Sequence, residues 1–429
     1  MTSRRLARHA AALAAGVLTL GLAVPVASAD QTRDQQWALK SLEAEAKVWP
    51  VSRGDGVVVG VIDTGVNQDH QDLTGQVLPG ADFSDGHTDG RVDTDGHGTG
   101  MASLIAGHGH GDQAGVVGLA PMAKILPIKV RTDADKSSPS PDPASPDGSD
   151  VSRNGFAEAI RFAVDHGAKV VNISLSGSYR FDSQLRKAVN YAVSKDVVLV
   201  AGTGNSGSSL GAEYPAAFPG VVAVGAADSK GEVWDRSTSG PETTLVAPGV
   251  SINHAAAKSP TAYASGSGTS DATAYVSATA ALIRAKYPNL SAGQVINRMI
   301  KSATPPANGA AVPNEHYGYG LVSPAKALEA NPAVDNGPRE NPLVGRMEAK
   351  GTPPPVGEET DEPTVEPMVP DGDSGGSGTT GIWVRLGVGA GLVVGVVVLV
   401  VVLVSRARRR RRGVAAGGYG QPPYGPPYQ

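Results

Sequence analysis

Three short motifs, far apart in the chain, each place one reactive side chain beside glycines. Residues 61–65 carry Asp63, residues 95–99 carry His97, and residues 267–270 end on Ser270. A serine hydroxyl is a weak nucleophile that needs a base, and the base needs a third group to orient it. The motifs therefore predict nucleophilic catalysis by Ser270, with His97 as the base and Asp63 as the carboxylate that orients the imidazole.

Each of these residues also has an ordinary structural explanation. Asp63 could form a turn, His97 could be structural, and Ser270 could cap a helix. Asp63, however, follows a buried apolar run at residues 57–62, and ligands bind beyond the carboxyl ends of parallel strands. Ser270 precedes an Ala-rich helical stretch at residues 272–287, so the helix dipole and free N–H groups there would favour an oxyanion.

The segments around these motifs alternate between two patterns. Short β-branched runs predict buried strands, and apolar residues at helical spacing predict helices between them. The predicted strands cover residues 57–62, 125–130, 169–173, 197–201 and 221–225; the predicted helices cover residues 156–164, 185–193 and, after an Asn-Leu-Ser cap, 292–302. This alternation predicts an α/β fold with a mostly parallel sheet covered on both faces.

Asn205 lies in a Gly-rich stretch, residues 201–207, directly after a predicted strand. Taken alone, it would be a turn residue. Together with the three motifs, we expect its side-chain amide to donate a hydrogen bond to the oxyanion.

The motifs together resemble those of the subtilases, the subtilisin-type serine proteases, in which Asp, His and Ser follow one another in this order. The resemblance covers about residues 51–330 and implies the subtilisin-like three-layer α/β fold, with a mostly parallel central sheet. It also implies a triad of Asp63, His97 and Ser270, with Asn205 as oxyanion donor. Two further segments would bind an extended substrate as an added strand: Ser174, Leu175, Ser176, Gly202, Thr203 and Gly204.

The chain departs from the usual subtilase pattern near these motifs. Asp271 stands directly after the nucleophile, where a hydrophobic residue is usual, and Ala274 replaces a proline. Gly100 and Ser103 replace a frequent His and Gly, and Ser176 replaces a Gly. Asp271 could be favoured by the helix dipole, or its charge could oppose the oxyanion; the sequence leaves both alternatives open.

The two ends of the chain predict export and a membrane anchor. Arginines, an apolar run and a small-residue site predict a signal peptide over residues 1–29; an uncleaved anchor is the alternative. Residues 386–404 carry no charge and would span a bilayer, so we expect a transmembrane helix over 383–404, with a buried soluble helix as the alternative. The arginines that follow predict a cytoplasmic tail over 405–429 and a protease domain outside the cell membrane.

The remaining segments complete the predicted organisation. Residues 30–50 form an N-terminal extension, 51–330 the peptidase domain, and 331–380 a linker rich in Pro, Gly and acidic residues. This layout resembles the mycosins, membrane-anchored subtilases associated with type VII secretion. The resemblance implies a polypeptide substrate, the lipid bilayer and type VII secretion components as partners.

Composition excludes several other classes of protein. The chain has no cysteine, which excludes disulfides, thiolate metal sites and a cysteine nucleophile. Its net charge of −4 argues against a nucleic-acid binder. We expect no cofactor; no calcium motif is evident, although structural calcium stays open. A serine esterase is disfavoured because Ser270 lacks the Gly-x-Ser-x-Gly elbow, whereas a scaffold role in a secretion complex stays as the alternative function.

Overall fold

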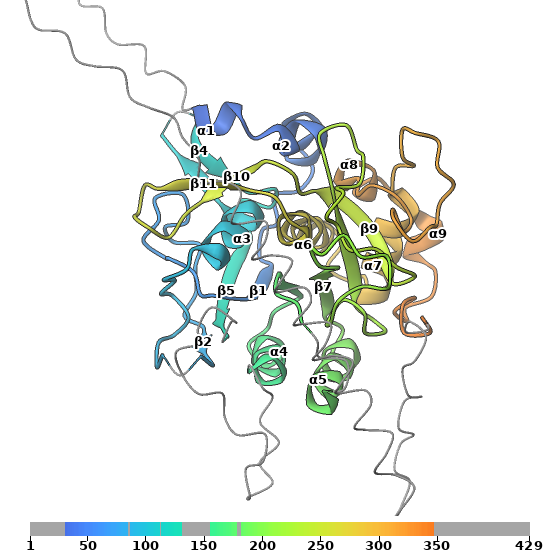
Figure 1. Cartoon of the computed structure of the whole chain (residues 1–429), viewed down its shortest axis with the longest axis horizontal. Coiled ribbons are helices and arrows are strands. Elements are labelled where there is room, and N and C mark those ends of the chain that lie inside the picture. Colours follow the sequence, from blue (N-terminus) through green and yellow to red (C-terminus); the bar gives the residue numbers. More distant parts are fainter. Residues whose placement is uncertain (1–30, 85, 112, 131–154, 178–181, 347–429) are drawn as a thin grey trace, which may run out of the picture. The chain divides into compact units, whose positions relative to one another are not determined.

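The computed structural model describes residues 31–346, except 85, 112, 131–154 and 178–181. Its centre is a seven-stranded sheet in which every pair of neighbours is parallel, in the order β2-β5-β1-β6-β7-β8-β9 (Figure 1). The strands are β1 (Val58–Asp63), β2 (Ala81–Asp82), β5 (Lys124–Lys129), β6 (Val170–Ile173), β7 (Val198–Gly202), β8 (Val222–Ala227) and β9 (Thr243–Pro248). The five predicted strands are confirmed to within two residues at each end, and β2 and β9 are additional.

Helices cover both faces of this sheet, which confirms the predicted α/β fold with a mostly parallel sheet. One face packs against α4 (Phe156–Asp165) and α5 (Ser183–Ser194), which lie below the sheet in Figure 1. The other face packs against α3 (His97–Ala106), α6 (Thr269–Lys286) and α7 (Ala292–Ser302). Because both faces are covered, the strands are buried almost throughout.

Two of these helices show how local sequence sets their ends. The predicted cap of α7 is confirmed, because the Ser291 side chain accepts from the Gln294 backbone while the Gln294 side chain reaches back to the Ser291 N–H. Helix α6 begins at Thr269, three residues before the predicted stretch, so Ser270 lies in its first turn. Nearly all of α6 is buried, and it contacts β6, β7, β8 and β9.

The described part of the N-terminal extension is folded onto the domain. It contains α1 (Gln31–Asp34), α2 (Trp37–Ser41) and a π-helical turn, η1 (Ala44–Val48). The Gln36 side chain donates to the Val117 carbonyl and accepts from the Val117 N–H, at 2.9 and 3.0 Å. The Trp49 indole donates to the Leu119 carbonyl at 2.9 Å. The extension is therefore held by hydrogen bonds to the hairpin of β3 (His108–His110) and β4 (Ala114–Val117) and to the chain that follows it.

The segment 331–346, predicted as the start of the linker, packs on the domain instead. It begins with α9 (Pro332–Asp335), which follows α8 (Pro324–Ala327). Leu343 is 4% exposed and belongs to the main core. The Arg346 guanidinium donates to four backbone carbonyls, and Asp335 pairs with the buried Arg298 at 2.6 Å. Composition placed the end of the domain too early. The segment is rich in Pro, Asn and charged residues, and only a few buried contacts attach it to the domain.

Several predictions fall on residues that the structure does not describe. The signal peptide at 1–29, the transmembrane helix at 383–404 and the tail at 405–429 all lie outside the described residues. Among the helices of residues 31–346 that are described, none combines the length and apolar character that crossing a bilayer requires.

Candidate active site

The contact between Asp63 and His97 joins two of the three predicted catalytic residues. Asp63 is the last residue of β1 and is fully buried, while His97 begins α3 and its side chain is 33% exposed. The His97 Nδ1 lies 2.7 Å from the Asp63 Oδ1. The Thr64 N–H donates to the same carboxylate oxygen at 2.8 Å. Because Nδ1 is occupied by the carboxylate, the Nε2 atom of His97 is left to exchange a proton with another group.

Gly98 makes this approach of helix and strand possible. A Cβ atom at position 98 would lie 2.1 Å from the Gly65 carbonyl oxygen and 3.0 Å from the Asp63 Cβ. Any side chain there would therefore force α3 away from the end of β1. The glycine that follows the histidine in the motif is thus required by packing.

Asp93 supports the same turn and was missed by the sequence analysis. It is 8% exposed, and its carboxylate accepts from the Thr64 and Thr99 hydroxyls at 3.0 and 2.6 Å. The backbone N–H groups of Asp95, Gly96 and Thr99 donate to it as well. Asp93 therefore fixes the entry to α3. A weak signal was present, since two aspartates precede His97 within a turn-forming segment.

Ser270 lies in the first turn of α6, beside the segment that follows β6. Its hydroxyl donates to the Ser174 carbonyl at 2.9 Å, and the Ser174 hydroxyl donates to the Ser270 carbonyl at 3.1 Å. Among the described residues, no hydrogen bond joins His97 to Ser270. Proton transfer to His97 therefore requires the Ser270 hydroxyl to turn away from Ser174.

Asn205 contacts the first residue of α6, directly before Ser270. Its Oδ1 accepts from the Thr269 N–H at 2.9 Å and from the Thr269 hydroxyl at 3.2 Å. Because the carbonyl side of the amide is held by the residue before the nucleophile, the Nδ2 side remains to donate. The Ser270 N–H, at the start of α6, is the second donor that this geometry offers.

The two predicted substrate-binding segments differ in what their backbones already bind. Ser174, Leu175 and Ser176 follow β6, while Gly202, Thr203 and Gly204 end and follow β7, and β6 and β7 are neighbours. The Thr203 N–H donates to Val224 and its carbonyl accepts from Glu213. The Gly204 N–H donates to the Thr269 hydroxyl, and its carbonyl accepts from Thr238. The backbone of Thr203 and Gly204 is therefore not open to the added strand that we predicted, which leaves residues 174–176 as the segment for it.

Asp271 lies in a buried environment that disfavours its charge. The residue is 4% exposed, and no group in the described part of the chain hydrogen-bonds to its Oδ1. Burial raises the pKa of Asp271 to about 7, against the opposing effect of His97. Desolvation therefore outweighs any benefit from the helix dipole.

The electrostatic environment of His97 favours its charged form. Burial alone would lower the pKa of His97, but the charge and hydrogen bond of Asp63, with smaller contributions from Asp271 and Asp95, raise this pKa to about 9. Helix α3, which begins at His97, also packs against α6.

The other departures near His97, Gly100 and Ser103, both face the strand that contains His254 and Ala255. A Cβ at Gly100 would lie 2.7 Å from the Nδ1 of His254, so the His254 ring occupies the space above this glycine. The Ser103 hydroxyl donates to the Gly100 carbonyl at 2.7 Å and accepts from the Ala255 N–H at 3.0 Å. Together they tie α3 to β10 (Ile252–Ala255), which pairs with β11 (Tyr263–Gly266). The structure gives no reason for Ala274 beyond its burial.

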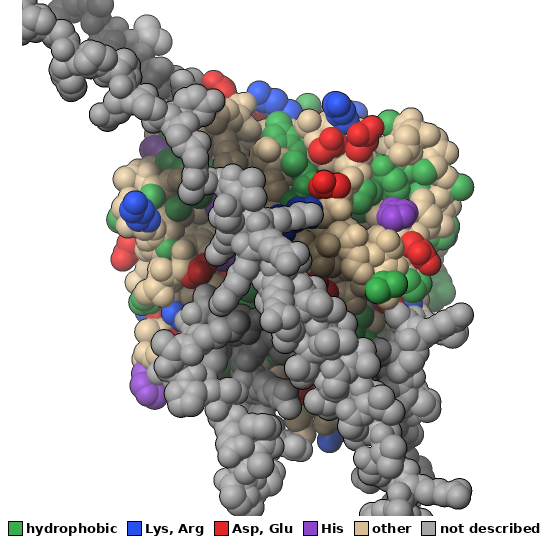
Figure 2. All heavy atoms as spheres, in the orientation of Figure 1, with side chains coloured by type: hydrophobic (Ala, Val, Ile, Leu, Met, Phe, Trp, Pro, Cys, Tyr) green, Lys and Arg blue, Asp and Glu red, His purple; other side chains and the backbone are tan. Residues whose placement is uncertain are grey.

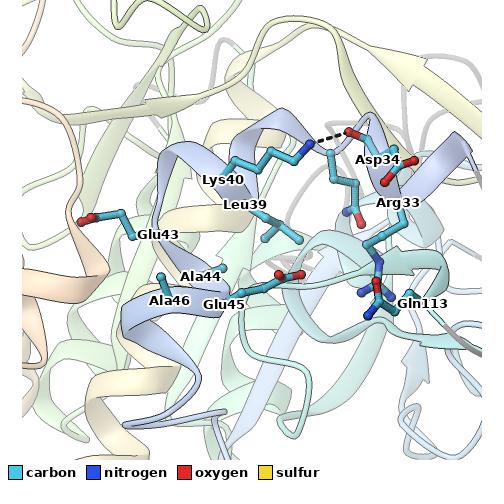
Figure 3. A pocket seen from close by; sticks show the side chains of 10 residues that line it. Arg33, Asp34, Leu39, Lys40, Glu43, Ala44, Glu45, Ala46 and Gln113 are labelled. Carbon is cyan, nitrogen blue, oxygen red and sulfur yellow. Dashed lines mark hydrogen bonds between the residues drawn. The ribbon is translucent and has the colours of Figure 1, made fainter. Parts of the chain in front are cut away.

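The remaining features are a pocket, the distribution of surface charge and the question of a metal site. A pocket on the N-terminal extension is lined by Arg33, Leu39, Lys40, Glu45 and Gln113, among others, and by none of the predicted site residues (Figure 3). Among the described residues visible in Figure 2, acidic and basic side chains are interspersed. No group of three or more His, Asp or Glu that could hold a metal ion occurs within the described ranges; the expected absence of a cofactor stays a prediction.

Comparison with known proteins gives consistent matches. The subtilase family model (Peptidase_S8) matches residues 54–320. Subtilisin DY from Bacillus licheniformis is 36% identical over 280 residues, which cover 65% of this chain and 92% of the relative. The crystal structure of MycP1 from Mycobacterium smegmatis superposes with a TM-score of 0.62 at 29% identity, covering 72% of this chain and 88% of that one. The MycP3 protease from the type VII (ESX-3) secretion system gives a TM-score of 0.58 at 32% identity, covering 69% and 88%.

Proposed function

Since this chain belongs to the subtilase family and is a serine endopeptidase, we propose that Asp63, His97 and Ser270 carry out its peptide hydrolysis. The observation that carries this assignment is the 2.7 Å contact between the buried Asp63, at the end of β1, and His97. Ser270 contacts Ser174, which follows the neighbouring parallel strand β6, so it lies at the same edge of the sheet. This edge is also a topological switch point, because β5 and β6 lie on opposite sides of β1.

In the proposed reaction, His97 first accepts a proton from Ser270 and then donates a proton to the leaving group. The Ser270 hydroxyl turns from Ser174, passes its proton to the Nε2 of His97 and attacks the substrate carbonyl. The oxyanion is stabilised by the Asn205 amide and the Ser270 N–H. His97 then protonates the leaving amine, and water attacks the acyl-enzyme by the same route. Asp63 keeps the imidazole in the required tautomer and stabilises its charged form.

Hydrolysis of an unfolded polypeptide tests the activity. The purified protein should cut reduced casein at pH 8 to 10, and mass spectrometry should show new chain termini that a serine-directed inhibitor prevents. Intact casein after prolonged incubation with folded protein would contradict the proposal.

The oxyanion role of Asn205 leads to a separate prediction. Asn205→Ala should lower kcat by about 10²–10³, with a small change in KM, because the amide is used in the transition state; the size of the effect is the one known for subtilisin. Steady-state kinetics on a fluorogenic peptide measures both constants. Asn205→Asp keeps the acceptor for Thr269 but replaces the donor, and it should be as impaired as the Ala variant. Near-normal kcat in the Asp variant would rule out the donor role.

Asp271 leads to a prediction about pH. His97 must be neutral to act as a base, so its pKa of about 9 predicts that kcat/KM rises through about pH 9. Asp271→Asn removes a negative charge that stabilises charged His97, so the rise should move to lower pH and activity at pH 7.5 should increase. The pH dependence of kcat/KM measures this shift, and Asp235→Asn, on an exposed loop, is the control.

The same variant should also change stability with a defined sign. The pKa of Asp271 is raised from 3.8 to about 7, so its favourable contribution is complete below pH 4 and is lost as pH rises through 7. Above pH 7, Asp271→Asn should therefore increase the free energy of unfolding by ~1–4 kcal/mol relative to the parent protein. Urea denaturation at pH 4 and pH 8.5 provides the comparison. An unchanged pH dependence of kcat/KM in Asp271→Asn would contradict the predicted effect on His97. A lower free energy of unfolding at pH 8.5 would contradict the predicted effect on stability.

We further propose that the protein is anchored in the cell membrane by residues 383–404, with the protease domain outside, and acts with a type VII secretion system. The uncharged run and the arginines after it support the anchor. The similarity to MycP1 and MycP3 supports the secretion context.

A scaffold role is the alternative, and one observation favours it. A similar solved structure, MycP1 of the ESX-1 system, is described as an essential component of that secretion system. Cells that carry Ser270→Ala can be compared with cells that lack the gene. Secretion retained only with Ser270→Ala would support a scaffold role, whereas equal failure would support proteolysis as the required function.

A further inference from the structure

Glu213 lies between the two segments that follow β6 and β7. Its N–H donates to the Thr203 carbonyl at 2.9 Å, and the next residue, Tyr214, pairs with Gly177 through hydrogen bonds of 3.0 and 3.3 Å. The Ser176 hydroxyl donates to the Glu213 Oε2 at 2.5 Å. The backbone of Glu213 is therefore bonded to the segment after β7, and its side chain to the segment after β6.

Gly204 gives the carboxylate its place. A Cβ at position 204 would lie 2.5 Å from the Cδ and from the Oε1 of Glu213, and Gly204 has a φ of +110°. A side chain is thus excluded on two grounds, by space and by backbone conformation. The Glu213 carboxylate therefore lies against Gly204. Gly204 directly precedes Asn205, the proposed oxyanion donor.

Within the part of the chain that the structure describes, no positively charged side chain balances the charge of Glu213. Its side-chain partner is a neutral hydroxyl, and no Lys, Arg or His of the described residues lies within ion-pair distance. The side chain is only partly buried, so solvent or a ligand can reach it. A carboxylate in this setting is a ready partner for a cation.

The reaction geometry indicates which substrate group would meet it. When the attacked carbonyl oxygen lies between the Asn205 amide and the Ser270 N–H, the side chain of the same substrate residue starts one carbon away. Ser174 contacts Ser270 and Gly204 contacts Thr269, so both segments border the start of α6. Glu213 joins these two segments. We infer that Glu213 determines specificity, and that this protease prefers Lys or Arg as the residue whose carbonyl is attacked. The inference rests on the proposed function and names its substrate class.

Matched peptides test the preference. Substrates that differ only at this residue (Arg, Lys, norleucine or Glu) are compared by kcat/KM. Because a charge-assisted hydrogen bond in a partly shielded site contributes about 10- to 100-fold, the parent protein should favour Arg over norleucine by that factor. Glu213→Gln, which keeps the shape, should abolish most of this ratio, and Glu213→Lys should favour the Glu peptide. Glu232→Gln, an exposed glutamate elsewhere, should leave the ratio unchanged.

A binding measurement separates this inference from the proposed function. Peptides that end in Arg or norleucine are titrated into folded Ser270→Ala protein, with and without Glu213→Gln. Tighter binding of the Arg peptide that depends on Glu213 supports the inference, even if no turnover is found. Equal binding of the two peptides, or a cleavage ratio that Glu213→Gln does not alter, would overturn it while leaving the assignment of Ser270 intact.

Discussion

Ser270→Ala is expected to lower kcat by about 10⁶, the size of loss known for the nucleophile of subtilisin, with little change in KM. The hydroxyl lost from this position supplies the attacking atom, while the donors at Asn205 and the start of α6 remain. Some catalysis over the uncatalysed reaction should therefore persist. Progress curves with a fluorogenic peptide at high enzyme concentration measure the remaining rate.

Ser277→Ala is the matched control for this substitution. Ser277 lies on the same helix, α6, is buried, and donates to the Asn172 side chain at 2.9 Å. Its loss should reduce stability but change kcat only a few-fold. Similar kcat values for Ser270→Ala and Ser277→Ala would mean that Ser270 is not the nucleophile.

Asp63→Asn is expected to lower kcat by about 10⁴ while preserving the fold. An Asn side chain has nearly the same shape, but its amide can donate to the imidazole and so favours the wrong tautomer of His97. The raised pKa of His97 should also fall, because the charge and hydrogen bond of Asp63 are what raise it. NMR titration of the His97 imidazole and steady-state kinetics measure the two effects.

A second buried Asp–His pair supplies the control for Asp63→Asn. Asp72 is fully buried and contacts the His110 Nδ1 at 2.6 Å, in the β3–β4 hairpin. Asp72→Asn removes a comparable buried charge but should leave kcat nearly intact in protein that is still folded. A fall in kcat as large as that of Asp63→Asn would attribute the effect to general damage.

The sequence was sufficient for the regular parts of the fold and for the contact between Asp63 and His97. Buried parallel strands are near-continuous apolar runs, and the Ser291 cap of α7 is a local signal, so both could be located by pattern alone. Asp63 and His97 meet because strand and helix ends converge at one sheet edge, which alternation of elements already implies.

The parts that could not be predicted depend on contacts between distant residues. Asp93 has the composition of a turn residue, and only its five hydrogen bonds reveal its role in positioning His97. Residues 331–346 have a linker-like composition, yet Leu343 and Arg346 attach them to the domain. The engagement of Thr203 and Gly204 by Val224, Glu213, Thr238 and Thr269 likewise depends on how loops pack, not on local pattern.

The position of the Ser270 hydroxyl makes one measurement decisive. The folded protein is treated with a fluorophosphonate, and the modified residue is identified by tandem mass spectrometry, in the parent protein and in His97→Ala. The catalytic assignment predicts a single adduct on Ser270 that forms quickly in the parent and very slowly without His97. An adduct on another residue, or labelling of Ser270 at the same rate with and without His97, would contradict it.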